Sequence, residues 1–167
     1  NIFSLFNLML QIGNILLTPQ LYIVSTPIGN LKDITIRALS ILKNCDIIAC
    51  EDTRVTKKLL SSYEIKSKNL VSIHEHSPQQ KLVFLIDKIK KGKSIALVSD
   101  AGTPLISDPG YKLVLMAIEE NLSIIPIPGP SAVTASLVGS GISTENFYFA
   151  GFLPSKENKK INTLKSL

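Results

Sequence analysis

Short apolar runs alternate with segments of helical period along most of the chain. The runs are rich in Ile, Leu and Val, and turn-forming residues end each of them. They are LYIVS (21–25), DIIAC (46–50), LVSI (70–73), SIALVS (94–99) and SIIPI (123–127). Between the runs, apolar residues recur every three or four positions, which predicts amphipathic helices. This alternation predicts an α/β fold with a mostly parallel sheet and helices on both faces.

Polar residues predict where several helices begin. Asp33, Ser77 and Asp108 each precede a stretch of helical period, and side chains of this kind cap helix N-termini. Pro78 and Pro109 follow two of these caps directly and suit the first helical position. The sequence therefore predicts helices that open at Pro78 and Pro109.

The helix after the second apolar run has a predicted inner face of its own. Asp52 or Thr53 is expected to cap this helix. Val55, Leu59 and Tyr63 recur at intervals of four, so they are predicted to face the sheet.

The pattern changes at both ends of the alternating region, which predicts three segments. Residues 1–19 are expected to be an N-terminal extension, with Met9 as a candidate start, in preference to a signal peptide or a membrane anchor. Residues 20–127 are expected to form an N-terminal α/β domain. Residues 128–167 are expected to form a linker helix and the start of a truncated second domain, in which FYFAGFLP (147–154) has the pattern of a strand.

Composition excludes a disordered chain but says little about partners. Hydrophobic residues make up 45% of the 167 residues and charged residues 19%, which is enough for a packed core. The net charge of +5 is compatible with RNA, although scattered lysines on solvated helix faces explain most of it. Cys45 and Cys50 indicate neither a disulfide framework nor a zinc site, which fits a reducing cytoplasm.

Ligands of parallel α/β sheets bind at the carboxyl ends of the strands, so the segments that follow the runs form the candidate site. They are TPIGN (26–30), EDTR (51–54), HEHS (74–77), SDAGTPLISDPG (99–110) and PGPSA (128–132). Neither GxGxxG nor GxxxxGK[ST] occurs, which disfavours the usual dinucleotide site and the P-loop. Glu51 and Asp52 have two equally good interpretations. They form either a helix cap with an ion pair, or the polar wall of a cleft that contains a general base. Two histidines are too few for a zinc site, and no metal is expected.

The segment SDAGTPLISDPG contains the pattern Ser-Asp-x-Gly twice. The second copy, from Ser107 to Gly110, is predicted to be the cap and first turn of a helix. The first copy has no such explanation. A carboxylate at Asp100, followed by Gly102 and Thr103, suits a ligand that carries hydroxyls, an ammonium or a sulfonium.

Five motifs in order resemble one known family. STPIGNLKDITIRAL, CEDTR, HEH, SDAGTPLISDPG and PGPSAVTAS, between about Gln20 and Pro154, are similar to ribosomal RNA small-subunit methyltransferases that act on the 2′-oxygen of a cytidine. That family belongs to the tetrapyrrole methylase superfamily of S-adenosylmethionine enzymes. Gly102-Thr103-Pro104 stands where the superfamily has Gly-Asp-Pro, which separates this branch from the porphyrin enzymes. The sequence departs from the family in two ways: Ser77-Pro78 replaces the usual Asn-Glu, and most of the expected second domain is missing.

The resemblance implies a two-domain, dimeric α/β enzyme with S-adenosylmethionine in the cleft between its domains. By motif position, the contacts to this cofactor fall on three loops. The implied residues are Pro27, Ile28, Asp100, Thr103, Ile106, Ser107, Ser131 and Ala132.

The resemblance also implies a reaction and its partners. A ribose 2′-hydroxyl would attack the sulfonium methyl in line, and a carboxylate is expected to take its proton because the hydroxyl is a poor acid. Glu51, Asp52 and Asp100 are the candidates, and the sequence does not rank them. The expected partners are 16S ribosomal RNA or the assembled small subunit in the cytoplasm, and a second copy of the chain; no membrane is expected.

Two alternatives stay open. One is a corrinoid or porphyrin methyltransferase of the same superfamily, which Gly-Gly-Asp-Pro at 101–104 would favour and which the sequence lacks. The other is a non-catalytic RNA-binding remnant of the family, which the apparent truncation of the second domain suggests.

Overall fold

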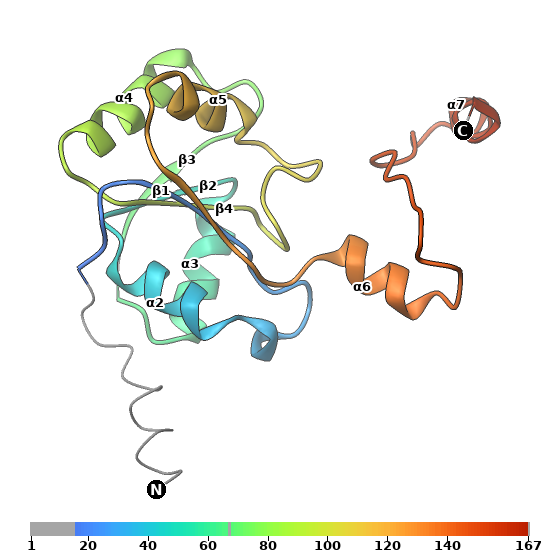
Figure 1. Ribbon diagram of the computed structural model, residues 1–167, viewed down its shortest axis with the longest axis horizontal. Coiled ribbons are helices and arrows are strands. Elements are labelled where there is room, and N and C mark those ends of the chain that lie inside the picture. The colour runs from blue at the N-terminus through green and yellow to red at the C-terminus, as the bar shows by residue number, and fades with distance from the viewer. Residues whose placement is uncertain (1–15, 67, 167) are drawn as a thin grey trace, which may run out of the picture. The chain divides into compact units, whose positions relative to one another are not determined.

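A computed structural model describes residues 16–66 and 68–166. Most of the predicted N-terminal extension, with Met9, lies outside these residues. All five apolar runs form parallel strands of one sheet, in the order β3-β2-β4-β1-β5 (Figure 1). The strands are β1 (Leu21–Val24), β2 (Ile47–Cys50), β3 (Asn69–Ser72), β4 (Ile95–Val98) and β5 (Ile124–Ile127). The prediction of an α/β fold is confirmed, and the described sheet is parallel throughout.

Helices cover both faces of this sheet. They are α2 (Ile36–Asn44), α3 (Thr53–Ser62), α4 (Gln79–Lys90) and α5 (Tyr111–Glu119), and a short 3-10 helix, η1 (Leu31–Asp33), precedes α2. The chain moves one way along the sheet from β1 through β3 and returns through β4 to β5. Right-handed crossovers therefore place α2 and α3 on one face and α4 and α5 on the other, as Figure 1 shows.

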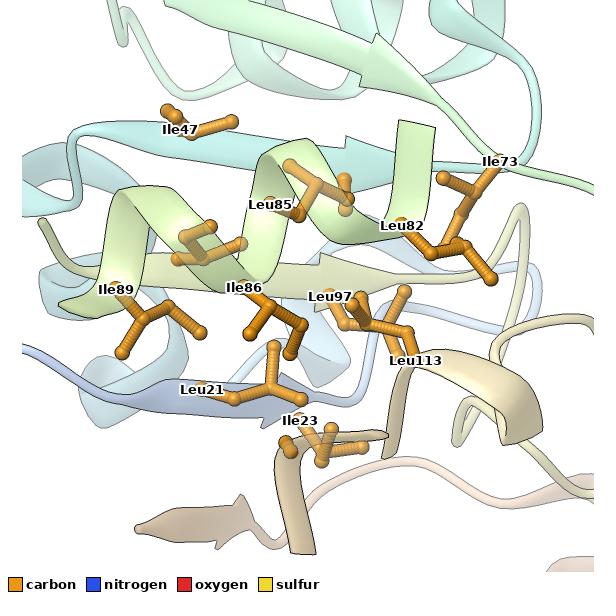
Figure 2. Packing of buried hydrophobic residues seen from close by; sticks show 13 residues of the cluster. Leu21, Ile23, Ile47, Ile73, Leu82, Leu85, Ile86, Ile89, Leu97 and Leu113 are labelled. Carbon is orange, nitrogen blue, oxygen red and sulfur yellow. The ribbon is translucent and has the colours of Figure 1, made fainter. Parts of the chain in front are cut away.

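The core consists of two layers of side chains, one on each face of the sheet. Leu85 of α4 is completely buried and belongs to a layer that also contains Leu21, Ile47 and Leu97 of the sheet and Leu113 of α5 (Figure 2). The second layer joins α2 and α3 to the opposite face. Because a parallel sheet is buried on both faces, its strands appear in the sequence as continuous apolar runs rather than as alternating ones.

The helix starts differ from the predicted caps. Asp33 ends η1 instead of capping a helix, and α2 begins after Thr35, whose hydroxyl accepts from the Ala38 amide. Pro78 is the N-cap of α4 rather than its first residue, and no side chain caps it, because the Ser77 hydroxyl accepts from the backbone amide of His74.

Asp108 does not cap α5, so that prediction is also wrong. Gly110 is the N-cap residue, with φ of +119°, and no side chain caps this helix. A Cβ at Gly110 would lie 2.9 Å from a methyl of Leu97 and 3.0 Å from one of Leu105. The close approach of the loop to the core therefore requires glycine, and it moves the helix start beyond Pro109.

The chain divides after Ala132 into two compact units. The second unit contains α6 (Ala132–Gly139), which begins at the boundary, and α7 (Glu157–Ser166). The expected strand at 147–154 does not form among the described residues, and Phe147, Tyr148 and Phe152 are exposed. A strand needs a hydrogen-bonding neighbour, and the described part of this unit offers none. The proposed start of a second domain at residue 128 remains a prediction.

No helix in the described part of the chain has the length and the apolar character needed to cross a membrane.

Candidate functional site

The loops that follow β1, β2 and β4 meet at one edge of the sheet. β4 pairs with β2 on one side and with β1 on the other, so the carboxyl ends of these three strands are neighbours. The chain then leaves β1 and β2 toward one face and β4 toward the opposite face. Loops that separate in this way form the usual ligand site of an open α/β sheet.

Two backbone hydrogen bonds join the first loop to the fourth. The Thr26 amide donates to the Gly102 carbonyl over 2.9 Å, and the Gly102 amide donates to the Thr26 carbonyl over 3.0 Å. Gly102 has φ of +84°, and a Cβ there would lie 3.3 Å from Cγ2 of Ile28. The two loops therefore behave as one unit that holds Ile28 against Gly102.

Thr103 connects this unit to the fifth loop. Its hydroxyl donates to the Pro130 carbonyl over 3.0 Å and lies 3.0 Å from the Ser25 hydroxyl. Since a hydroxyl has one proton to donate, Ser25 is the donor in the second bond. A Cβ on Gly129 would lie 2.8 Å from Cβ of Ser25, so the fifth loop also passes against the first at van der Waals distance. Thr103 thus links three loops through one side chain.

The three candidate proton acceptors converge at the ends of β2 and β4. Asp100 accepts a hydrogen bond from the Asp52 amide over 3.1 Å. Asp52 caps α3, as predicted, by accepting from the Arg54 amide over 2.7 Å, and its carboxylate pairs with the Arg54 guanidinium at 2.6 Å. Hydrogen bonds from Arg54 lower the pKa of the Asp52 carboxyl to about 2. Asp52 is thus occupied by a cap and an ion pair.

Glu51 lies in a different environment. Burial raises the pKa of the Glu51 carboxyl above its usual value, and the nearby carboxylates of Asp100 and Asp108 raise it further. Burial likewise raises the pKa of the Asp108 carboxyl. The Asp100 carboxylate raises this pKa further, whereas a hydrogen bond from Ser99 lowers it. Asp108, predicted as a helix cap, therefore belongs to the group of carboxylates at this edge.

The predicted cofactor residues lie on three loops at this edge, but not all are linked. Pro27 is buried and Ile28 is exposed. Ile106 is 47% exposed, and Ser107 has φ of +60° in the outer part of the fourth loop. The remaining positions follow β5, where Ser131 is half-buried and Ala132 is exposed. In the described part of the chain, Ile106 and Ser107 form no hydrogen bond with Pro27, Ile28, Asp100 or Thr103.

A groove with a volume of about 240 Å³ lies beside α3. The first loop and η1 contribute Pro27, Gly29 and Leu31 to its lining, α3 contributes a stripe of four side chains, and Asp100 completes it. The predicted inner face of α3 is wrong, because Thr56 and Leu60 are the residues buried against the sheet.

The histidine segment adds no metal site to this edge. Within the described ranges, no three His, Cys, Asp or Glu side chains are placed to hold a metal ion. His74 and His76 are exposed, and the His74 Nδ1 lies 3.2 Å from the Ser77 hydroxyl.

Sequence reasoning missed several residues of this edge. Ser25 was assigned to the end of a strand and Gly129 to a turn, although both hold the loops together. The sequence does not distinguish Lys58 from the other scattered lysines, although it lines the groove. A serine that ends an otherwise apolar, buried run is the one signal that could have pointed to Ser25.

The fold and this edge define a parallel α/β unit in which the loops at the carboxyl ends of β1, β2 and β4 gather the candidate site residues. The chain belongs to the Tetrapyrrole (Corrin/Porphyrin) Methylases, whose family profile matches residues 20–166. It is similar to proteins named Ribosomal RNA small subunit methyltransferase I. The Mesorhizobium japonicum protein is 51% identical over 151 residues, which are 90% of this chain and 51% of the relative. The Vibrio cholerae protein is 53% identical over 146 residues, which are 87% of this chain and 50% of the relative.

The chain thus spans about half the length of these relatives. Solved structures with the same fold include a cobalamin biosynthetic enzyme, cobalt precorrin-4 methyltransferase, with a TM-score of 0.61 and 18% identity over 87% of this chain and 64% of that chain. They also include uroporphyrin-III-C-methyltransferase from Thermus thermophilus, with a TM-score of 0.56 and 20% identity over 75% of this chain and 54% of that chain. At this level of identity, the two structures establish the fold alone.

Proposed function

We propose that the protein takes part in methylating the 2′-oxygen of a cytidine ribose in 16S ribosomal RNA, with S-adenosylmethionine as the methyl donor. The observation that carries the proposal is the identity of 51–53%, over 87–90% of the chain, to relatives named as small-subunit ribosomal RNA methyltransferases. The two solved porphyrin and corrinoid methyltransferases share only 18–20% identity, which supports a tetrapyrrole substrate less.

The chemistry of the carboxyl edge fits this methyl donor. S-adenosylmethionine carries ribose hydroxyls, an ammonium and a sulfonium, which need hydrogen-bond acceptors and nearby negative charge. Asp100 and its neighbouring carboxylates supply both, and the exposed side chains of Ile28 and Ile106 offer an apolar surface for adenine. We assign the donor to Pro27, Ile28, Asp100, Thr103, Ile106, Ser107, Ser131 and Ala132.

In this assignment Thr103 acts mainly by positioning. Its only proton is donated to Pro130, and it accepts a proton from Ser25, so one acceptor site is left for a ligand. The hydroxyl therefore holds the first, fourth and fifth loops in the arrangement that the donor requires.

The chemical step needs a group that accepts the hydroxyl proton. When bound, S-adenosylmethionine supplies an electrophilic methyl group. The 2′-oxygen of the substrate would form the new bond to that carbon as the carbon–sulfur bond breaks, with the electron pair left on sulfur. Asp52 is a poor acceptor because Arg54 holds its carboxylate and lowers its pKa to about 2. Asp100 and Glu51 therefore remain the candidate bases.

The proposed partners follow from the proposed reaction. The substrate is the small-subunit RNA or the assembled small subunit, which places the protein in the cytoplasm. We also propose a homodimer, since exposed aromatic side chains such as Phe147, Tyr148 and Phe152 are typical of surfaces that another chain covers.

The test is methyl transfer to small subunits that lack the modification. Because the chain spans half of its relatives, it replaces the matched half of the Vibrio cholerae protein in a hybrid, and the unaltered relative is the positive control. We expect labelled methyl groups in 16S RNA at a linkage that resists alkaline hydrolysis, because a 2′-O-methyl group blocks the attacking oxygen. A folded hybrid that labels a tetrapyrrole, or no RNA, would refute the proposal.

A further inference from the structure

One side of α3 carries a stripe of side chains that its packing on the sheet does not explain. Val55, Lys58, Leu59 and Ser62 recur at the spacing of one helix face, and all four line the 240 Å³ groove. The buried face of the same helix is formed by other residues. The groove therefore has a lining of its own, separate from the core.

The walls of this groove are apolar but remain open to solvent. Val55 is 37% exposed, and Leu31 of η1, which lines the same groove, is 48% exposed. The volume lies below the ~300 Å³ at which pockets for drug-sized ligands begin, so the groove suits one unit of a longer ligand. Apolar walls of this kind suit the flat face of a base.

The lining of the groove contains charges of both signs. The ammonium of Lys58 forms no ion pair with a carboxylate among the described residues, whereas the guanidinium of Arg54 is already held by Asp52. Asp100 is the carboxylate of the lining. A cation, apolar walls and a carboxylate are the complements of a phosphate, a base and a hydroxyl.

We propose that this groove receives the ribonucleotide that is methylated, with Lys58 binding its phosphate, Val55 and Leu31 contacting its base, and Asp100 facing its 2′-hydroxyl. The inference rests on the proposed function and deepens it by naming where this unit holds RNA. It also divides the edge in two: the nucleotide enters beside α3, and the methyl donor occupies the loops tied by Thr103. Asp100 lies where the two parts meet, and it is the carboxylate that takes the hydroxyl proton.

The experiment measures RNA and S-adenosylmethionine binding separately on the hybrid described above, in which this chain replaces the matched half of the Vibrio cholerae protein. Lys58→Ala is compared with Lys57→Ala, since Lys57 is exposed on the same helix but does not line the groove. The RNA is a 16S transcript, and its affinity is followed over a series of salt concentrations. A single lost phosphate contact reduces the slope of log K against log salt by ~0.7–0.9, which is about five- to eightfold in affinity at 0.1 M salt.

We expect this loss for Lys58→Ala and wild-type RNA affinity for Lys57→Ala. Val55→Trp, which fills the groove, should weaken RNA binding and leave the affinity for S-adenosylmethionine unchanged. Equal effects of both lysine variants would overturn the inference, as would loss of S-adenosylmethionine binding in Val55→Trp with RNA binding intact. A hybrid that binds S-adenosylmethionine but neither binds nor methylates small-subunit RNA would overturn the proposed function together with this inference. A hybrid that methylates 16S RNA while Lys58→Ala keeps wild-type RNA affinity would overturn this inference alone.

Discussion

Replacing Thr103 by valine tests whether one hydroxyl holds three loops together. Valine keeps the branched shape but removes the donor to Pro130 and the acceptor for Ser25, both at 3.0 Å. Each neutral hydrogen bond contributes ~0.5–1.5 kcal/mol, and a buried hydroxyl left without a partner costs ~1–3 kcal/mol. Ser25 is buried. We therefore expect Thr103→Val to lower the free energy of unfolding by about 1–3 kcal/mol.

The assay is urea unfolding at neutral pH, with Thr103→Ser as the matched control. Serine retains the hydroxyl and loses one methyl group, which is worth at most ~1 kcal/mol at this half-buried position. The double variant with Ser25→Ala should lose less than the sum of the two single losses, because both remove the same bond. The reasoning is refuted if valine is as stable as serine, or if the losses at Ser25 and Thr103 are additive.

Three further predictions concern the fold and the carboxylates. Gly110→Ala should lower the free energy of unfolding by ~1–3 kcal/mol more than Gly92→Ala, because both have positive φ but only a Cβ at Gly110 meets core methyls; equal losses in urea unfolding would contradict this. Leu85→Ala should cost ~2–5 kcal/mol in the same assay, since its completely buried side chain leaves a cavity; a loss below 1 kcal/mol would mean that this layer is loosely packed. Glu51→Gln should stabilise the protein at pH 7, because the pKa of the Glu51 carboxyl is raised in the folded state. Its ionisation therefore opposes folding as the pH rises above about 4.5, and the stability gained by glutamine should vanish below that pH. A gain independent of pH would contradict the proposed cause.

Much of the fold was predictable because its signals are local. Each strand coincides with one apolar run to within a residue at either end, and the alternation with helical segments is enough to imply parallel strands. The rule that ligands bind at the carboxyl ends then selected all five segments that follow the strands, and the strand order makes those after β1, β2 and β4 neighbours. The helix starts were less predictable, since Ser77 and Asp108 have the right chemistry for caps but find other partners, His74 and Ser99.

The candidate site was predictable only in part. Asp100, Thr103 and Ile28 were singled out as ligand contacts, and that role stays a prediction. Their mutual arrangement could not be predicted from the sequence, because no local pattern of residues determines the strand order that makes β1 and β4 neighbours. The inner face of α3 was also ambiguous, because Leu59 and Leu60 are adjacent and point to different faces of the helix. Val55 shares a face with Leu59, and only packing on the sheet selects the face of Leu60.

By itself the sequence determined the strands, the alternation and the loops in which chemistry is concentrated, because these depend on the periods of neighbouring residues. The tertiary structure alone decided which of those loops touch. The Ser25 and Thr103 hydroxyls are 78 residues apart in the chain and 3.0 Å apart in space. It also turned Lys58 and Val55 from ordinary surface and core positions into the lining of a groove. A hydrogen bond or a groove is formed by atoms from distant segments, so it exists only once the sheet has brought those segments together.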